Sequence, residues 1–152
     1  MEYVEALTEY QPDATGRSLF LAGGITGSLD WQAVVCQQLA DTALVLLNPR
    51  RAAFPIHDPA AAEQQINWEY RHLRHATAVL FWFPAETLCP ITLYELGAWS
   101  MTTKPLLVGV HPAYQRRQDV IIQSRLARPA LQVVTSLEAL IAQARRFADC
   151  RL

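Results

Sequence analysis

Glu95 is the residue of this chain that is best placed to carry out chemistry. It belongs to the segment Cys89–Trp99, which follows the apolar run Ala78–Phe83. This order predicts a helix that begins just beyond a buried strand, with Glu95 on its first turn. A carboxylate at that point faces the crevice in which open α/β sheets bind ligands, where it can act as a nucleophile. A purely structural role also fits, because an acidic residue stabilises a helix N-terminus.

Two regions that follow predicted strands carry groups suited to ligand binding. Gly23–Gly27 is rich in glycine, so its backbone N–H groups could approach a phosphate or a sugar, although a flexible turn explains the same composition. Asn48–Arg51 places two guanidinium groups on a loop stiffened by proline, which suits phosphate or carboxylate recognition, although paired arginines are also common on surfaces. The candidate binding residues of these regions are Gly23, Gly24, Ile25, Thr26, Asp30, Trp31, Asn48, Arg50 and Arg51.

Glu69 is a second candidate acid. It lies in Asn67–His75, the predicted helix before the third strand, and it reaches the site only if that part of the helix sits at the open rim. Cys89 stands beside a predicted helix N-terminus, which favours a thiolate, but no histidine is placed as its base, so a cysteine nucleophile is disfavoured. The four histidines lack metal-ligand spacing, and the three cysteines lack metal or redox spacing. Neither a metal ion nor another cofactor is therefore expected.

Five short apolar runs alternate with longer stretches of helical character. The runs predict strands at 19–22, 43–47, 78–83, 106–110 and 131–134. Helices are predicted to begin near Asp30, near Pro59 with Asp58 as its cap, near Pro90, near Asp119 and at Ser136. The alternation predicts an α/β fold, namely a flavodoxin-like (Rossmann-like) five-stranded parallel sheet with helices on both faces and the strand order 2-1-3-4-5.

Length and composition indicate a single globular domain. Residues 1–16 are expected to form a loose N-terminal arm, and residues 17–152 are expected to form that domain. A content of 51% hydrophobic and 18% charged residues is typical of a compact globular protein rather than a disordered one. A formal net charge of -1 gives no electrostatic support for binding nucleic acid or a membrane surface. Neither a signal-peptide pattern nor a membrane-spanning apolar run is present, so a cytoplasmic protein is expected.

Four segments, in this order, resemble the nucleoside 2-deoxyribosyltransferase-like family. The segments are Leu19–Gly27, then Asn48–Arg51, then the helix bearing Trp68 and Glu69 together with Phe81–Pro84, and finally Thr92–Ala98. The resemblance covers about residues 18 to 125. It implies a flavodoxin-like fold, a homodimer or larger homo-oligomer, and action on the N-glycosidic bond of a 2′-deoxynucleoside or nucleotide. Phe83 and Thr92, within the last two segments, are further candidates for substrate binding.

The resemblance also implies roles for the two acids. Glu95 matches the family's Glu-x-Gly pattern and is the expected nucleophile, which would attack the anomeric carbon and form a glycosyl-enzyme ester. Glu69 falls where the family usually has an aspartate, which implies sugar positioning or proton transfer. A free nucleobase would then be the acceptor. A hydrolase that releases a free base and a nucleotide-binding module without catalysis remain the alternatives.

Two positions depart from the family pattern. Phe20 stands where members usually carry a tyrosine, and Leu88–Pro90 replaces a segment that often contains an aspartate. The site is therefore expected either to accept a different nucleobase or leaving group, or to be completed by other groups, such as Glu86 or Tyr94. The loop His111–Asp119 of a second subunit is a candidate source, through Tyr114 and Asp119, because a symmetric dimer could place one such loop over each partner's site.

Overall fold

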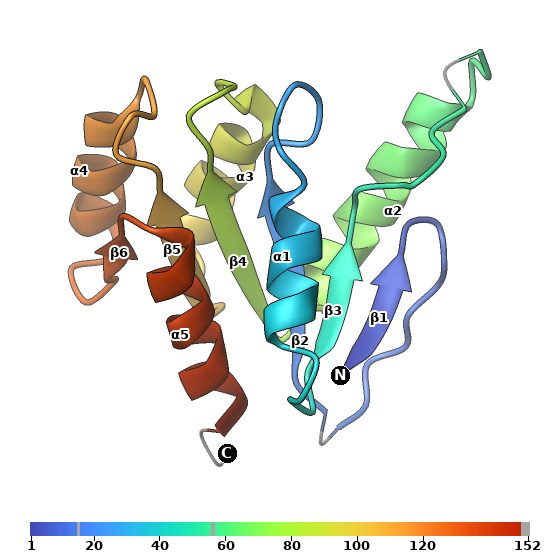
Figure 1. Ribbon diagram of the computed structural model, residues 1–152, viewed down its shortest axis with the longest axis horizontal. Coiled ribbons are helices and arrows are strands. Elements are labelled where there is room, and N and C mark those ends of the chain that lie inside the picture. The colour runs from blue at the N-terminus through green and yellow to red at the C-terminus, as the bar shows by residue number, and fades with distance from the viewer. Residues whose placement is uncertain (15, 56, 150–152) are drawn as a thin grey trace.

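The described part of the chain forms a six-stranded parallel sheet with helices on both faces (Figure 1). The computed structural model describes residues 1–14, 16–55 and 57–149, so Cys150 and the last positions of the expected domain lie outside it. In chain order the elements are β1 (Glu2–Glu5), β2 (Ser18–Gly23), α1 (Trp31–Gln38), β3 (Val45–Asn48), α2 (Ala61–His75), β4 (Ala78–Phe83), α3 (Pro90–Ser100), β5 (Leu106–Val110), α4 (Arg117–Ala127), β6 (Val133–Val134) and α5 (Leu137–Asp149). Within the described residues, no helix is long and apolar enough to cross a membrane.

The flavodoxin-like architecture predicted from the sequence is confirmed. Strand order across the sheet is β1-β3-β2-β4-β5-β6, and every neighbouring pair is parallel. The five predicted strands are β2 to β6, and their order matches the predicted 2-1-3-4-5. The chain therefore runs from β2 to β3, which lies on one side of β2, and later crosses to β4, which lies on the other side of β2. Ligand sites of open α/β sheets lie at such a switch point.

The number of strands differs from the prediction, because the segment expected to be a loose arm contributes β1. This strand pairs with β3 along its length, from Glu2 opposite Val45 to Glu5 opposite Asn48. Beyond it, the indole of Trp68 on α2 donates a hydrogen bond to the carbonyl oxygen of Thr8 at 2.7 Å. An edge strand with one buried side needs few apolar residues, which is why its sequence did not resemble the other strands.

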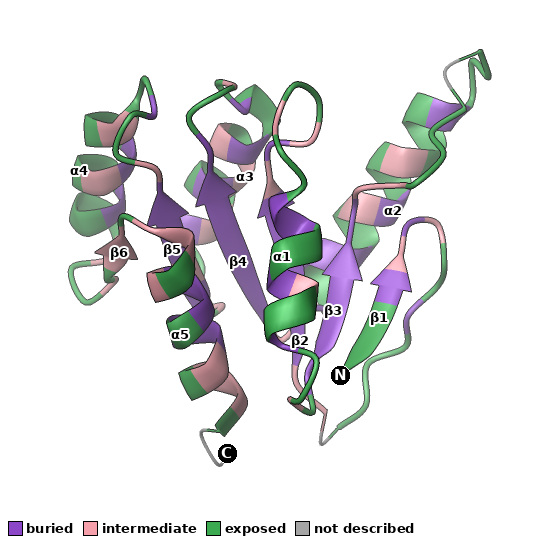
Figure 2. Ribbon diagram, viewed as in Figure 1, coloured by how far each residue is buried: buried purple, intermediate pink, exposed green. Residues whose placement is uncertain are grey.

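Two apolar layers, one on each side of the sheet, hold the fold together. β2 supplies Phe20 and Ala22 to the layer under α2, α3 and α4, and Leu19 and Leu21 to the layer under α1 and α5. Figure 2 shows the central strands as continuously buried, which accounts for their nearly unbroken apolar sequences.

The predicted helix starts are close to those observed. Asp30 caps α1 by accepting a hydrogen bond from the N–H of Ala33 at 3.0 Å, and Ser136 accepts one from the N–H of Ala139 at 3.2 Å. α2 begins at Ala61 rather than at Pro59, because Asp58 accepts its hydrogen bond from the N–H of Ala60 and so forms a turn ahead of the helix.

Candidate active site

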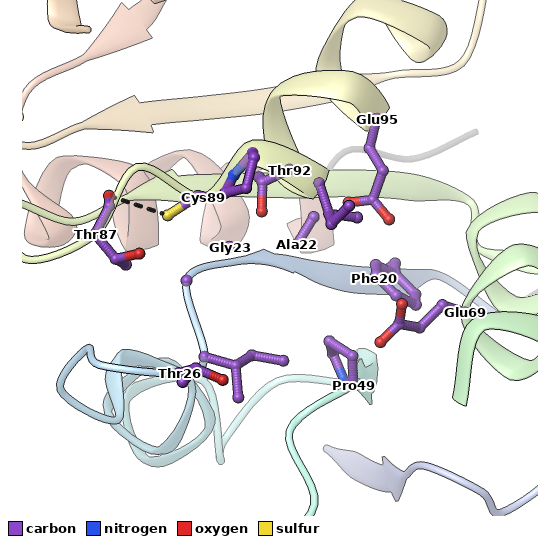
Figure 3. A pocket seen from close by; sticks show the side chains of 14 residues that line it. Phe20, Ala22, Gly23, Thr26, Pro49, Glu69, Thr87, Cys89, Thr92 and Glu95 are labelled. Carbon is purple, nitrogen blue, oxygen red and sulfur yellow. Dashed lines mark hydrogen bonds between the residues drawn. The ribbon is translucent and has the colours of Figure 1, made fainter. Parts of the chain in front are cut away.

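A cavity of about 260 Å³ lies at the carboxyl end of the sheet, where the loops after β2, β3 and β4 meet α2 and α3 (Figure 3). Its position coincides with the switch point between β2 and its two neighbours. The lining residues are Phe20, Ala22, Gly23, Gly24, Ile25, Thr26, Pro49, Glu69, Thr87, Cys89, Pro90, Ile91, Thr92 and Glu95. The cavity thus contains both candidate acids and much of the glycine-rich loop.

Glu95 reaches the cavity from α3, which begins at Pro90 as the sequence predicts. It lies beyond the first turn, where no acidic residue is found, so stabilisation of the helix N-terminus does not explain it. Cys89 precedes the helix in a left-handed conformation with φ of 48°, and this sharp turn redirects the chain from the loop after β4 into α3.

Glu69 and Glu95 point toward the same part of the cavity from α2 and α3, on either side of Phe20 (Figure 3). Burial, and secondarily the Glu69 carboxylate, raises the pKa of Glu95 to about 8. Burial also raises the pKa of Glu69, while a hydrogen bond from Gln65 opposes that change. Two carboxyl groups that repel each other in a partly dehydrated site do not readily ionise together, so the pair favours holding one proton near neutral pH.

The raised pKa of Glu95 predicts that the folded protein loses stability as pH increases. Below about pH 4.5 Glu95 is protonated in both states, whereas between that value and pH 8 the folded state retains a proton that the unfolded chain has lost. The stability that this retained proton gives to the folded state is therefore lost as pH rises through 8. Glu95→Gln should remove this penalty, which is on the order of a few kcal/mol above pH 8.

Urea unfolding of wild type and Glu95→Gln at pH 5, 7 and 9 tests this prediction. The stability advantage of the variant should grow toward pH 9, whereas a substitution at the exposed Glu63 of α2 should give none. A difference between Glu95→Gln and wild type that does not change with pH would contradict it.

The glycine-rich loop is held by close packing. The indole of Trp31 donates a hydrogen bond to the carbonyl oxygen of Gly24 at 2.9 Å from beneath the loop. A Cβ atom on Gly24 would lie 2.7 Å from Thr87 and 3.0 Å from the sulfur of Cys89. Glycine is therefore required here for close approach between two cavity walls.

Arg50 stabilises the glycine-rich loop through several polar contacts. Its guanidinium donates hydrogen bonds to the carbonyl oxygens of Ile25 at 3.1 Å and Leu29 at 3.2 Å, and to the side chain of Gln32 at 3.0 Å. It also lies 3.4 Å from the carboxylate of Asp30. The neighbouring Arg51 stacks on the ring of Phe54, with 5.4 Å between its guanidinium carbon and the ring centroid. Neither arginine lines the cavity.

These contacts predict that Arg50→Ala lowers the free energy of unfolding by about 1.5 to 3 kcal/mol, because several charge-assisted hydrogen bonds are lost and their acceptors are left unpaired. Arg51→Ala, which removes a single stacking contact, is the matched control and should cost less than about 1 kcal/mol. Urea denaturation would measure both. Equal losses in the two variants would contradict the assignment of Arg50 to the loop.

The other predicted binding residues divide into two groups. Gly23, Gly24, Ile25, Thr26 and Thr92 line the cavity with the two acids, whereas Asp30, Trp31, Asn48, Arg50, Arg51, Phe83, Tyr114 and Asp119 do not. Asn48 is buried, and its amide donates to the hydroxyl of Tyr3 at 3.0 Å while its oxygen accepts from the N–H of Arg50. It therefore shapes the turn after β3.

Tyr114 packs inside its own subunit. Its ring lies 5.3 Å from that of Phe83, and its hydroxyl donates a hydrogen bond to the carbonyl oxygen of Leu88 at 2.7 Å. Asp119 forms an exposed ion pair with Arg116 at 3.0 Å. Both residues therefore have contacts within their own subunit, and a role for Tyr114 and Asp119 in a partner's site stays a prediction.

Several lining residues were not predicted. Pro49, Thr87, Pro90 and Ile91 all lie in segments that directly follow parallel strands, and that position was the available signal. Their contribution to the cavity depends on how closely the loops approach one another, which the sequence does not specify.

A family model described as nucleoside 2-deoxyribosyltransferase like matches residues 16–114, well over half of the chain. No curated protein matches the chain in sequence. The matched segment contains β2 to β5 and both acids of the cavity. The chain therefore belongs to the nucleoside 2-deoxyribosyltransferase-like family.

Proposed function

We propose that the protein cleaves the N-glycosidic bond of a 2′-deoxynucleoside and transfers the sugar to an acceptor nucleobase. The observation that carries this proposal is the partly buried carboxyl group of Glu95, which lines the cavity at the switch point together with a second acid. Retaining cleavage of a glycosidic bond requires such a pair, one group as nucleophile and the other to manage the proton of the leaving group.

The reaction would proceed in two displacements at the anomeric carbon. A Glu95 oxygen attacks this carbon while the carbon–nitrogen bond breaks, and the bonding electrons leave with the nucleobase, which takes up a proton from Glu69. A nitrogen of the acceptor base then attacks the same carbon and transfers its proton to Glu69. The ester breaks, and the Glu95 carboxylate is regenerated. Water in place of the acceptor would give hydrolysis.

The charges around the cavity favour a nucleoside over a nucleotide. Two carboxyl groups line the cavity, and none of its lining residues within the described chain is lysine, arginine or histidine. Arg50, the nearest candidate for a phosphate clamp, is engaged by loop carbonyl groups. A phosphate held close to the carboxylates would be repelled without a compensating cation.

A substrate panel tests the proposed function. The protein would be incubated with deoxynucleosides and with their 5′-monophosphates, each with and without a free acceptor base, and the products identified by mass spectrometry. Base exchange on deoxynucleosides is expected. Release of free base regardless of acceptor would favour the hydrolase, and absence of cleavage across the panel would contradict the proposal.

We further propose that the protein works as a homodimer or larger homo-oligomer that covers the face formed by α2 and α3. A groove of about 520 Å³ on this face shares Glu69, Ile91 and Glu95 with the cavity. Its exposed apolar side chains include Ile66 and Tyr94. A second copy seated there would bury them and exclude water from the acids.

Light scattering of wild type should therefore show an oligomer, which Tyr94→Glu should dissociate. Leu126→Glu, at an equally exposed position on α4, is the control and should leave the assembly intact. A monomeric wild type at assay concentration would contradict this proposal.

A further inference from the structure

Gln65 links the two walls of the cavity on the side of Glu69. It lies on α2 one turn before Glu69, and its amide nitrogen donates a hydrogen bond to Glu69 Oε1 at 2.8 Å and to the carbonyl oxygen of Pro49 at 2.7 Å. Both Glu69 and Pro49 line the cavity. The two hydrogens of one amide group are thus directed to the acid and to the loop after β3.

This arrangement stabilises the ionised form of Glu69. An N–H donor to a carboxylate favours the charged state, and the contact with Pro49 fixes the direction from which the amide donates. Burial raises the pKa of Glu69, and the Gln65 amide lowers it again. Gln65 therefore makes Glu69 a stronger acid than its dehydrated position alone would allow.

The other charged and titratable groups around the pair come from several elements. α2 contributes Arg74, which stacks on Tyr70 at 4.0 Å, and α3 contributes Tyr94. Cys89 lies in the loop before α3, and Arg50 and Arg51 follow β3 with the contacts described above. Among the described residues, Gln65 is the hydrogen-bond partner of the Glu69 carboxyl group, and none is hydrogen-bonded to the carboxyl group of Glu95.

We infer that Gln65 is a positioning residue that sets the acidity of Glu69 for protonation of the leaving nucleobase. The inference rests on the proposed function. The single proton of the acidic pair moves from Glu95 to Glu69 when the substrate binds, which leaves Glu95 as a carboxylate nucleophile. As the glycosidic bond breaks, Glu69 passes this proton to a nitrogen of the base, and the base leaves uncharged. Without the Gln65 amide, Glu69 retains the proton more tightly.

Gln65→Met keeps the length of the side chain and removes its donor, so it provides the first test. For neutral deoxynucleosides kcat should fall by about three- to tenfold, because a weaker acid donates its proton more slowly from the complex in which Glu69 is protonated. A 7-methylpurine deoxynucleoside carries a positive charge on its base, which leaves without being protonated, and its kcat should fall less than about twofold. Gln64→Met, at the exposed neighbouring position, should change neither. Equal losses on both substrates would overturn the inference.

A second measurement does not depend on turnover. NMR titration of the carboxyl carbons of ligand-free protein, assigned with Glu69→Gln and Glu95→Gln, should show the midpoint of Glu69 rising by about one pH unit in Gln65→Met. Gln65→Glu, which replaces the amide donor by a carboxyl group, should raise it at least as far. An unchanged midpoint in both variants would overturn the inference. If no substrate is cleaved, the proposed function fails, and this titration still decides whether Gln65 controls Glu69.

Discussion

Glu95→Gln is expected to abolish glycosidic turnover while the fold stays intact. The amide has nearly the shape of the carboxyl group but cannot form the ester to the anomeric carbon, so kcat/KM should fall by at least about 10⁴-fold. Steady-state assays on the best deoxynucleoside would measure the loss, and circular dichroism would verify the fold. Because the variant also removes a partly buried acid whose pKa is raised, it should be more stable than wild type at alkaline pH.

Glu63→Gln, an exposed substitution on α2, is the control and should retain full activity. A loss of only about tenfold in Glu95→Gln corresponds to roughly 1.4 kcal/mol of barrier. That value is too small for a missing nucleophile and would point to another group as the site of attack.

Gly23→Ala is expected to destabilise the protein by about 3 kcal/mol or more. A Cβ atom at this position would lie 2.4 Å from the ring of Trp31 and 2.5 Å from the carbonyl oxygen of Trp82. The indole is buried beneath the glycine-rich loop, and the carbonyl belongs to the neighbouring strand β4, so neither can move without disturbing the sheet. Urea denaturation would measure the loss directly.

Gly97→Ala provides the matched control for this substitution. Gly97 lies inside α3, and a Cβ atom there would meet nothing within 4 Å. Alanine favours the helix over glycine, so stability should rise by about 0.4 to 1 kcal/mol. Comparable destabilisation in both variants would mean that steric crowding at Gly23 is not the cause.

The central sheet could be predicted from the sequence because its strands are buried on both faces. Apolar runs such as Ala78–Phe83 have no other stable environment in a chain of this composition. β1 could not be recognised in the same way, because Glu2 and Tyr3 are exposed and only one side of the strand is buried. Its pairing depends on β3, which lies far away in the sequence.

The site residues that could be predicted from the sequence are those that lie just after the ends of strands. Gly24 and Thr26 directly follow β2, and Glu95 lies on the helix after β4, so all three reach the cavity. Whether Glu69 reaches the cavity depends on how α2 is rotated about its axis, which the sequence does not specify. For Arg50 the residue type suggested a phosphate, whereas the acceptors it contacts are carbonyl groups of a distant loop.

The role of Gln65 could not be inferred from its residue type. Glutamine on a helix is most often a solvated residue, and its contact with Pro49 exists only because α2 packs beside the loop after β3. Hydrogen-bonded partners of this kind depend on tertiary structure, and they adjust the acids that the sequence pattern identifies.

Mass spectrometry of the acid-quenched protein tests the central claim most directly. Wild type mixed with a deoxynucleoside and denatured within a turnover should carry one deoxyribosyl group on the peptide that contains Glu95, and Glu95→Gln treated identically should carry none. An adduct on Glu69 or Cys89, or turnover by Glu95→Gln at the wild-type rate, would contradict the assignment of Glu95 as the nucleophile.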